Sequence, residues 1–304
     1  MAVYEIGVAS NRSPNREESL EEPSEPAPDA LIGQTLSGYS ILRKIGEGGM
    51  GVVYLAEHRS LKRLAAIKFL SHHLVNDPAY IELFLREARA AARLNHGNLV
   101  TVYEAGSKGD DIYFFIMEYV EGEDLESLLE GSETIVLPLH DVIDYISQAA
   151  SGLGYAHRKN LIHRDIKPDN LMLTKDGVIK VADLGLAKWL GQQSGALSQH
   201  GLILGHHYYV APERLKKPDG FDGRADIYSL GATMYRLVTG EMPYDEPPGV
   251  VMAKHLSDPV PDPGEVNPDL DRDICEIIMT MMAKNPEDRY QDMEEVRTEL
   301  ARYA

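Results

Sequence analysis

Residues 46–51 read GEGGMG, a glycine pattern that occurs in several different folds. Its glycines match G-x-G-x-x-G, which alone is a weak signal, because an ordinary turn can carry the same pattern. A dinucleotide-binding fold needs a helix directly after the pattern, but Val52, Val53 and Tyr54 follow and favour a strand. A P-loop needs Gly-Lys-Ser/Thr at its end, and Gly51 precedes a valine. The stretch is therefore predicted to be a glycine-rich hairpin whose backbone N–H groups can approach phosphates.

The sequence around this hairpin changes from strand patterns to helix patterns along the chain. Apolar residues at helical spacing predict a first helix over 77–96, with Asp77 as N-cap and Pro78 as its first residue. Short apolar runs predict strands over 39–46, 52–58, 64–70, 99–107 and 110–120, and longer patterns predict helices over 141–159, 224–240, 270–285 and 293–304. A β-rich part followed by an α-rich part predicts an α+β fold, and the sequence contains no internal repeats.

Residues 1–36 differ in composition from the rest of the chain. Serine alternates with glutamate there, and proline recurs, so the segment cannot bury enough apolar surface to offset its ordering entropy. We predict a disordered acidic tail over 1–36 and a folded domain over 37–304. Two interpretations of the tail stay open: a solvated linker without a role, or a segment that is phosphorylated.

Charge and composition exclude several kinds of partner. The 304 residues carry a formal net charge of -18, which disfavours nucleic acid and anionic membrane surfaces. The single cysteine, Cys275, cannot form an intramolecular disulfide, which fits a reducing compartment such as the cytoplasm. The N-terminus lacks the pattern of a signal peptide, and no apolar run is long enough for a membrane span.

The order and spacing of further motifs provide a much more specific signal than the glycine pattern. Lys68 follows Gly51 by seventeen residues at the end of a predicted strand, and Glu87 lies on the next helix. HRDIKPDN at 163–170, DLG at 183–185 and APE at 211–213 follow in this order. From Tyr39 to the C-terminus the chain resembles the protein kinases. It is most similar to the bacterial, eukaryotic-like (Hanks-type) Ser/Thr protein kinases, for which GEGGMGVVYLA is typical wording.

This resemblance implies a two-lobe architecture and an activity. The N-lobe would cover about 37–119 and the helical C-lobe about 120–304, with ATP between them. The implied reaction is ATP-dependent phosphorylation of Ser/Thr hydroxyls on protein substrates, with autophosphorylation in signalling and a possible homodimer for phosphorylation in trans. The alternative is a pseudokinase, weakly active or inactive, that acts as a nucleotide-binding interaction module. Pseudokinases usually lack Lys68, Asp165 or Asp183, and this chain has all three.

The resemblance also implies roles for residues in the catalytic motifs. Lys68 would contact the α- and β-phosphates, and Glu87 would hold Lys68 through an ion pair. Asp165 would accept the proton of the substrate hydroxyl, and Lys167 would neutralise the transferring phosphoryl group. An exposed charge paired with a neighbouring arginine is the alternative role for Glu87.

The same comparison implies the ligands of Mg²⁺ and of the nucleotide. Asn170 and Asp183 would bind Mg²⁺, because their oxygen atoms suit a hard cation. DLG replaces the usual DFG, a mild departure because Leu184 is also apolar. The residues implied for the nucleotide are Gly46, Gly48 and Gly51 in the loop, Lys68, Val53 and Ala66 above adenine, Met172 below it, Met117 as gatekeeper, the backbone of Glu118 and Val120, and Asp124 at the ribose. Val53, Ala66 and Met172 also suit plain core packing.

Four residues are candidates for regulation. Arg164 next to Asp165 is typical of kinases that respond to a phosphate in the activation loop, and Ser194 and Ser198 are the hydroxyl residues predicted to accept it. His206 stands where similar kinases usually have a threonine that bonds the catalytic Asp and Lys. We interpret it as a departure at the substrate platform and expect His206→Thr to raise peptide turnover.

Two further pairings are predicted to be structural. Glu213 is expected to pair with Arg289 inside the C-lobe. Asp226 is expected to brace the catalytic loop without touching substrate.

Overall fold

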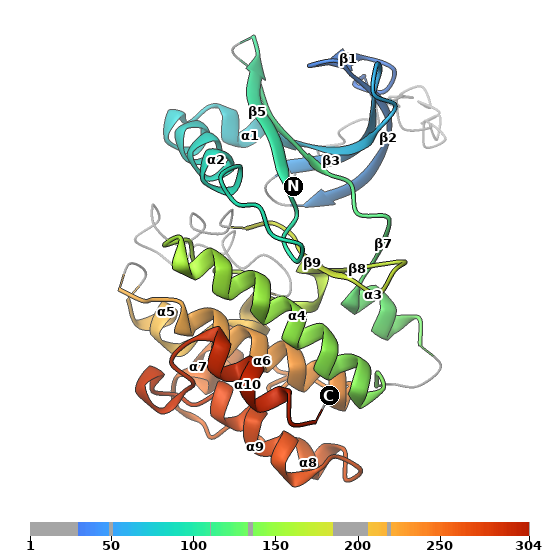
Figure 1. Ribbon diagram of the computed structural model, residues 1–304. Coiled ribbons are helices and arrows are strands. Elements are labelled where there is room, and N and C mark those ends of the chain that lie inside the picture. Colours follow the sequence, from blue (N-terminus) through green and yellow to red (C-terminus); the bar gives the residue numbers. More distant parts are fainter. Residues whose placement is uncertain are drawn as a thin grey trace, which may run out of the picture.

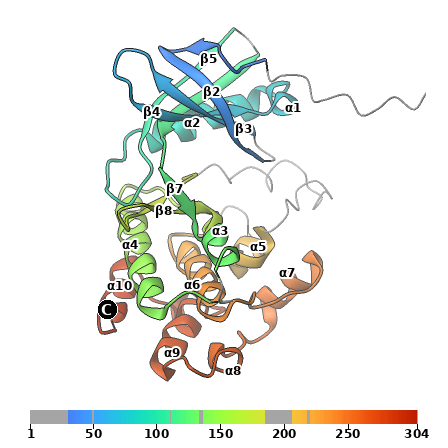
Figure 2. The same cartoon turned by 90° about the vertical axis from the view of Figure 1, so that its right-hand side faces the viewer.

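The computed structural model describes residues 30–48, 51–109, 111–132, 136–184, 206–217 and 220–303. A small lobe built on a twisted sheet lies above a larger helical lobe (Figure 1). Turned by 90°, the same two lobes are joined along one side by the chain that leads into β7 (Figure 2). The predicted two-lobe α+β architecture is confirmed.

The small lobe contains a six-stranded antiparallel sheet with strand order β1-β2-β3-β4-β6-β5. The glycine-rich stretch lies at the turn between β2 and β3, as predicted, with Gly48 opposite Gly51. Gly51 has a φ of 154°, and a Cβ there would lie 1.8 Å from the carbonyl oxygen of Phe69, so only glycine lets β3 approach β4 this closely. The strands are β1 (Thr35–Leu36), β2 (Tyr39–Gly48), β3 (Gly51–His58), β4 (Leu64–Leu70), β5 (Val102–Lys108) and β6 (Ile112–Glu118).

Helix α2 (Pro78–Ala91) packs against this sheet and follows the short helix α1 (His72–Val75). Its start confirms the prediction, because the Asp77 side chain accepts a hydrogen bond from the N–H of Ala79 and Pro78 is the first helical residue. Its buried face, which includes Phe84 and Ala88, packs on Phe115 of β6. The position of α2 over the sheet is therefore set by its apolar stripe.

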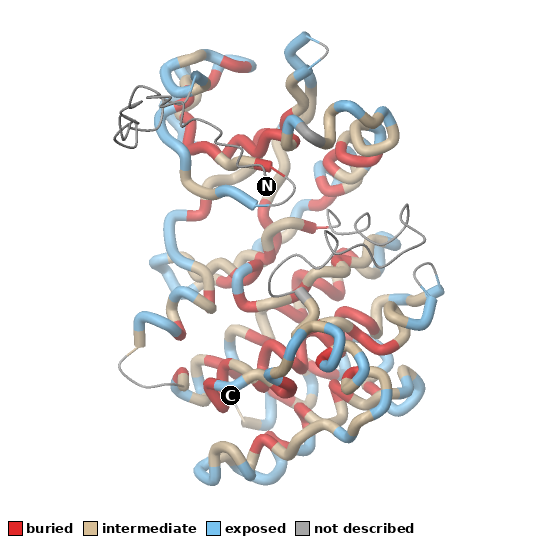
Figure 3. Tube along the Cα trace, turned by 180° about the vertical axis from the view of Figure 1, so that it is seen from behind, coloured by how far each residue is buried: buried red, intermediate tan, exposed pale blue. Residues whose placement is uncertain are grey.

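The large lobe is organised around α6 (Arg224–Thr239), whose residues are almost all buried. Figure 3 shows that buried segments run through the interior of this lobe. Around it lie the other helices and a small three-stranded sheet of order β7-β8-β9. The helices are α3 (Leu125–Glu130), α4 (Leu139–Arg158), α5 (Pro212–Lys216), α6 (Arg224–Thr239), α7 (Pro248–Ser257), α8 (Pro263–Val266), α9 (Arg272–Met281) and α10 (Met293–Leu300). The strands are β7 (Gly122–Asp124), β8 (Leu171–Thr174) and β9 (Ile179–Val181), and the 3₁₀ turns are η1 (Pro168–Asn170), η3 (His206–Tyr209) and η4 (Pro286–Asp288).

The structure corrects the predicted boundary of the acidic tail. Strand β1 pairs with β2 through Leu36 and Tyr39, and Leu36 is buried, so ordered structure begins before residue 37. The reason is local: Leu36 lies directly before the turn at Ser37 and Gly38, and its apolar side chain packs in the core of the small lobe. Residues 1–29 lie outside the described residues. None of the helices in the described ranges combines the length and apolar character that a bilayer crossing requires.

Candidate active site

The loop that carries Asp165 is held from below by one buried carboxylate. Asp226, near the start of α6, is 0% exposed and accepts hydrogen bonds from the backbone N–H groups of His163 and Arg164, both at 2.8 Å. Its third partner is Nε2 of His157, also at 2.8 Å. Burial opposes ionisation, but these hydrogen bonds and the nearby imidazoles outweigh it and lower the pKa of Asp226. The predicted brace is confirmed.

His163 connects the catalytic loop to the segment that carries Asp183. Its Nε2 lies 2.7 Å from the carbonyl oxygen of Ala182, which can only accept, so Nε2 carries the hydrogen. Its Nδ1 accepts the N–H of Asp165 at 3.2 Å. Each nitrogen of the His163 ring is thus held by one partner, and the ring sets the distance between the two motifs. Arg164 and Asp183 both have positive φ, 73° and 55°, which marks backbone that the surrounding contacts hold in place.

Asn170 is oriented by Asp165. Its Nδ2 donates to the carbonyl oxygen of Asp165 at 2.7 Å and to the carboxylate at 3.1 Å. Because that carbonyl can only accept, the amide nitrogen of Asn170 must face Asp165. The amide oxygen then points away from Asp165 and can bind a cation. The backbone of Asn170 is tied to the Asp183 segment, since its carbonyl oxygen accepts the N–H of Ala182 at 2.9 Å.

Lys68 forms an ion pair with Asp183 that the sequence did not predict. Its ammonium nitrogen, on β4, lies 2.8 Å from each carboxylate oxygen of Asp183. Glu87 lies on the half-buried side of α2, and its ion pair with Lys68 stays a prediction. A cavity of about 20 Å³ lies beside α2 and is lined by residues that include Ala88, Met117 and Asp183.

The donor set of the site fits Mg²⁺ only together with phosphate. Asn170 and Asp183 supply two oxygen ligands, whereas Mg²⁺ takes six and is usually shared between one or two protein carboxylates, waters and phosphates. In the described part of the chain there is no cluster of three His, Cys, Asp or Glu side chains suited to a metal. The described side chains alone therefore do not complete the coordination of Mg²⁺, and a nucleotide would supply further oxygens.

The strand register gathers the residues that were predicted for the nucleotide at the junction of the lobes. Gly46 and Val53 face each other across β2 and β3, and Val53 is in turn opposite Lys68. Ala66 on β4 is opposite Met117 on β6. In the lower sheet Asp124 is opposite Met172. Cross-strand neighbours lie about 5 Å apart, so the members of each pair are adjacent, and their contact with a nucleotide stays a prediction.

Two of these residues also have structural roles. The N–H of Glu118 donates to the carbonyl oxygen of Thr101 at 2.8 Å, and its side chain pairs with Lys180 at 2.7 Å. The Asp124 carboxylate caps α3 by accepting the N–H and the hydroxyl of Ser127, both at 2.8 Å. Val120 is buried at the start of the link between the lobes. These contacts hold the region in place without a nucleotide, so a nucleotide would meet a surface that is already formed.

Sequence reasoning missed a second arginine beside the catalytic loop. Arg214 of α5 donates through Nη1 to the carbonyl oxygen of Arg164, and both guanidinium carbons lie 5.6 Å from the centre of the Phe221 ring. Burial lowers the pKa of Arg214, with the nearby carboxylates of Asp165 and Asp226 opposing this. The arginine directly after APE was the available signal.

The regulatory candidates are placed only in part. The catalytic candidate Lys167, which is outside the regulatory set, has its ammonium nitrogen 3.5 Å from a carboxylate oxygen of Asp169. His206 begins η3, but its side chain is outside the described part, as are Ser194 and Ser198. The predicted pair of Glu213 and Arg289 is confirmed at 2.8 Å.

Comparisons with known proteins agree with this geometry. Residues 39–300 match the family described as protein kinase domain. The chain is 38% identical over 274 residues to serine/threonine-protein kinase PrkC of Bacillus subtilis, covering 89% of this chain and 41% of that protein. It is 37% identical over 273 residues to a probable serine/threonine-protein kinase of Clostridium acetobutylicum, with the same coverage. This chain therefore spans about two fifths of the length of these relatives. The solved PknI kinase domain of Mycobacterium tuberculosis is 30% identical, with a TM-score of 0.70, over 90% of this chain and 98% of that one.

Proposed function

The chain belongs to the protein kinase domain family, and on this basis we propose that it transfers the γ-phosphoryl group of ATP to serine or threonine hydroxyls of proteins. The observation that carries the proposal is the convergence of three separate motifs on one point. Asn170 bonds Asp165, His163 joins the Asp165 loop to Ala182, and the next residue, Asp183, holds Lys68. Such an arrangement serves phosphoryl transfer, in which positioning and charge do most of the work.

Each of the charged groups has a defined task in this proposal. Asp165 orients the substrate hydroxyl and accepts its proton, and Asn170 holds that carboxylate in direction. Lys167 balances charge on the transferring group, and Lys68 holds the α- and β-phosphates. Mg²⁺, when bound through Asn170 and Asp183, neutralises phosphate charge. The net charge of -18 makes these local cations and the metal necessary for binding a polyanion.

Lys68 has to change its partner for this function. With ATP bound, its ammonium group would contact phosphates and its carboxylate neighbour would be Glu87, which lies on the half-buried side of α2. The state described here holds Lys68 on Asp183 instead. We infer that the enzyme is regulated between these two arrangements, with phosphorylation in trans within a homodimer as the candidate trigger. Because ATP is the phosphoryl donor, the domain is expected to work in the cytoplasm.

The proposal is tested with Mg²⁺, ATP labelled at the γ-phosphate, and a serine-containing protein substrate such as casein. Asp165→Asn is expected to lower transfer at least about a hundredfold, because the base that orients the hydroxyl is lost. The matched control is Asp176→Asn, the same change on an exposed turn between β8 and β9. Equal labelling by wild type and Asp165→Asn would show that Asp165 has no catalytic role. No labelling by any variant, with ATP still bound, would favour the nucleotide-binding interaction module.

A further inference from the structure

We propose that His255 is a positioning residue for the protein substrate, because it fixes the carbonyl group of Tyr208 in η3 from the core of the large lobe. His255 lies on α7 and is 0% exposed, and its Nε2 is 3.0 Å from the Tyr208 oxygen. The inference rests on the proposed function, and it takes η3 as part of the substrate platform that the resemblance to kinases assigns to His206. Nothing in the sequence motifs points to this residue.

The structure links η3 to the catalytic loop through α6. Asp226 holds the backbone of the catalytic loop, and Ser229, three residues later on the same helix, donates to the carbonyl oxygen of Tyr209 at 2.7 Å. Residues three apart lie on one face of a helix, so one rigid element sets both segments. His255 adds a second anchor at the adjacent carbonyl. Two neighbouring carbonyl groups of η3 are thus each held by a buried side chain.

The hydrogen bonds of His255 have a single possible direction. The Tyr208 carbonyl can only accept, so Nε2 carries the hydrogen. Nδ1 lies 2.7 Å from the hydroxyl of Tyr228 and must accept from it if the imidazole is neutral. The Tyr228 oxygen in turn lies 3.3 Å from the ammonium nitrogen of Lys284, which can only donate. Donation therefore runs from Lys284 through Tyr228 and His255 to Tyr208.

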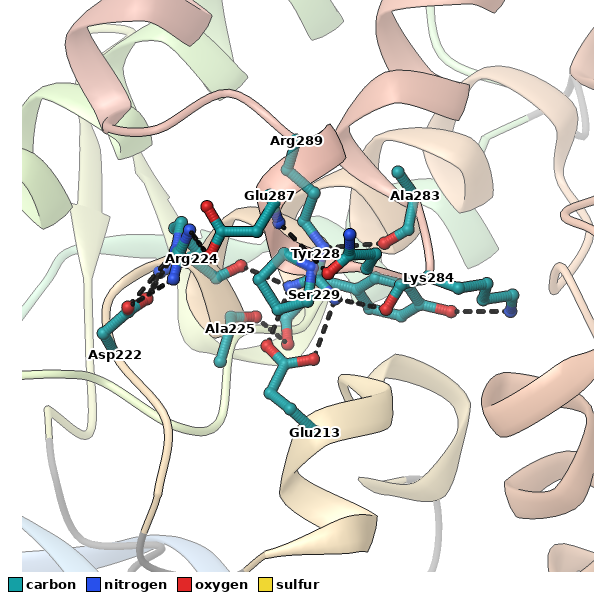
Figure 4. A network of polar contacts seen from close by, with 12 residues as sticks. Glu213, Asp222, Arg224, Ala225, Tyr228, Ser229, Ala283, Lys284, Glu287 and Arg289 are labelled. Carbon is teal, nitrogen blue, oxygen red and sulfur yellow. Dashed lines mark hydrogen bonds and ion pairs between the residues drawn. The ribbon is translucent and has the colours of Figure 1, made fainter.

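Lys284 and Arg289 fix the far end of this series of hydrogen bonds, at the Tyr228 side chain. Lys284 also donates to the hydroxyl of Tyr244 at 3.0 Å and to the carbonyl oxygen of Lys254 at 3.2 Å, so three acceptors face its three hydrogens. Arg289 lies 4.9 Å from the centre of the Tyr228 ring and is paired with Glu213 (Figure 4). The Tyr228 hydroxyl cannot turn toward another partner without losing this arrangement. The chain of donors is preorganised, which is what a positioning group requires.

Two substitutions at His255 separate the bond to η3 from the rest of the network. Glutamine places its amide group near the position of Nε2 and can still donate to Tyr208, whereas asparagine reaches only the position of Nδ1 and leaves the Tyr208 carbonyl without its donor. Both remove the ring and keep one amide, and asparagine is one methylene shorter, which adds the packing cost of one buried methylene group. Thr233→Val is the control for general weakening of α6, because its hydroxyl bonds only the Ser229 carbonyl within the helix, at 2.8 Å.

The experiment uses the full chain and measures KM for a serine peptide, KM for ATP, and hydrogen exchange of the amides of 206–210. His255→Asn is expected to raise the peptide KM roughly tenfold and to speed the exchange, as loss of one buried hydrogen bond implies. The KM for ATP should stay within about twofold, because the predicted nucleotide residues are elsewhere, and His255→Gln and Thr233→Val should resemble wild type.

Equal behaviour of His255→Asn and His255→Gln, or the same rise with Thr233→Val, would overturn the inference. If the wild type phosphorylates no peptide, the proposed function fails, but the exchange comparison still decides whether His255 holds η3. If His255→Asn does not fold, Tyr228→Phe takes its place, since it removes the hydroxyl that sets the imidazole and leaves the ring packing. It should then raise the peptide KM and the exchange rate, and unchanged values would count against the inference.

Discussion

Lys68 and Asp183 are separated by 115 residues in the sequence, yet the ammonium nitrogen of one lies 2.8 Å from both carboxylate oxygens of the other. This ion pair joins β4 of the small lobe to the segment after β9 in the large lobe. In the proposed function Lys68 would contact phosphate and Asp183 would bind Mg²⁺, so both residues would have to leave this pair when the nucleotide and the metal bind.

The first prediction concerns this pair. Lys68→Met is expected to abolish the thermal stabilisation that ATP with Mg²⁺ gives the wild type, because the α- and β-phosphates lose their cation. The measurement is a thermal melt with and without ATP and with and without Mg²⁺. Lys62→Met is the control, since Lys62 is exposed on the β3–β4 turn. A shift in Lys68→Met as large as in wild type would contradict the assignment.

Much of the fold followed from local pattern. The strands over 39–46 and 64–70 and the helix from Pro78 were predicted within a few residues, because a capping aspartate, a proline and apolar periodicity are all local signals. Short elements such as α3 and the sheet of β7, β8 and β9 were not predicted. Strands of three or four residues carry too little periodicity, and they form because long-range neighbours pair with them.

The sequence predicted which residues form the site, but not all of the contacts that they make in this structure. Ordered motifs identified Asp165, Asn170 and Asp183, and the structure brings them together. The partner of Lys68 could not be predicted, because a motif specifies which carboxylates are near and not which of them the ammonium contacts. The role of His255 could not be predicted for another reason. It depends on packing between α6, α7 and η3, which no short stretch of sequence encodes.

The second prediction tests the brace under the catalytic loop. Asp226→Asn is expected to lower the free energy of unfolding by about 3 kcal/mol, because one amide oxygen cannot accept three hydrogen bonds and the amide N–H₂ faces a donor. Urea unfolding measures this. The control is Asp222→Asn. The Asp222 carboxylate pairs with Arg224 but is largely exposed, so this change should lower the free energy of unfolding by less than about 1 kcal/mol. Similar costs for both variants would mean that burial of Asp226 matters little.

The third prediction concerns Arg289. Its buried guanidinium group donates to both oxygens of Glu213 at 2.8 Å and to the carbonyl oxygens of Arg224 and Ala283. Lysine keeps the charge but has three donors on one nitrogen, so Arg289→Lys should lower the free energy of unfolding by about 2 kcal/mol. Arg302→Lys, on the exposed pair with Glu299, should have almost no effect. The idea fails if both variants unfold alike.

The fourth prediction concerns the residues that lie outside the described part. Incubation with ATP is expected to place phosphate on Ser194 or Ser198, which can then pair with Arg164. The double variant Ser194→Ala, Ser198→Ala should lose roughly tenfold in peptide phosphorylation, the equivalent of one charge-assisted hydrogen bond. Phosphosite mapping by mass spectrometry and initial rates give the answer. Full activity in the double variant would exclude these serines as the switch.

The fifth prediction uses the pH dependence of stability. Burial and the nearby charge of Lys284 lower the pKa of His255 from 6.5 to about 3. Between these two values the unfolded chain binds a proton that the folded chain does not, so the free energy of unfolding falls as the pH falls below 6.5. Lys284, whose pKa burial lowers to about 8, stays protonated throughout this window and adds no slope there.

The comparison of wild type with His255→Gln isolates this slope, because the variant has no group that titrates at this position. Between pH 7 and pH 5 the wild type should lose about 2 kcal/mol more of its free energy of unfolding than the variant does. Urea unfolding at the two pH values measures both losses, and the other acidic and basic groups cancel in the difference. Parallel losses would show that His255 takes up its proton equally in both states, and that the buried chain of donors from Lys284 to Tyr208 is not what keeps the imidazole neutral.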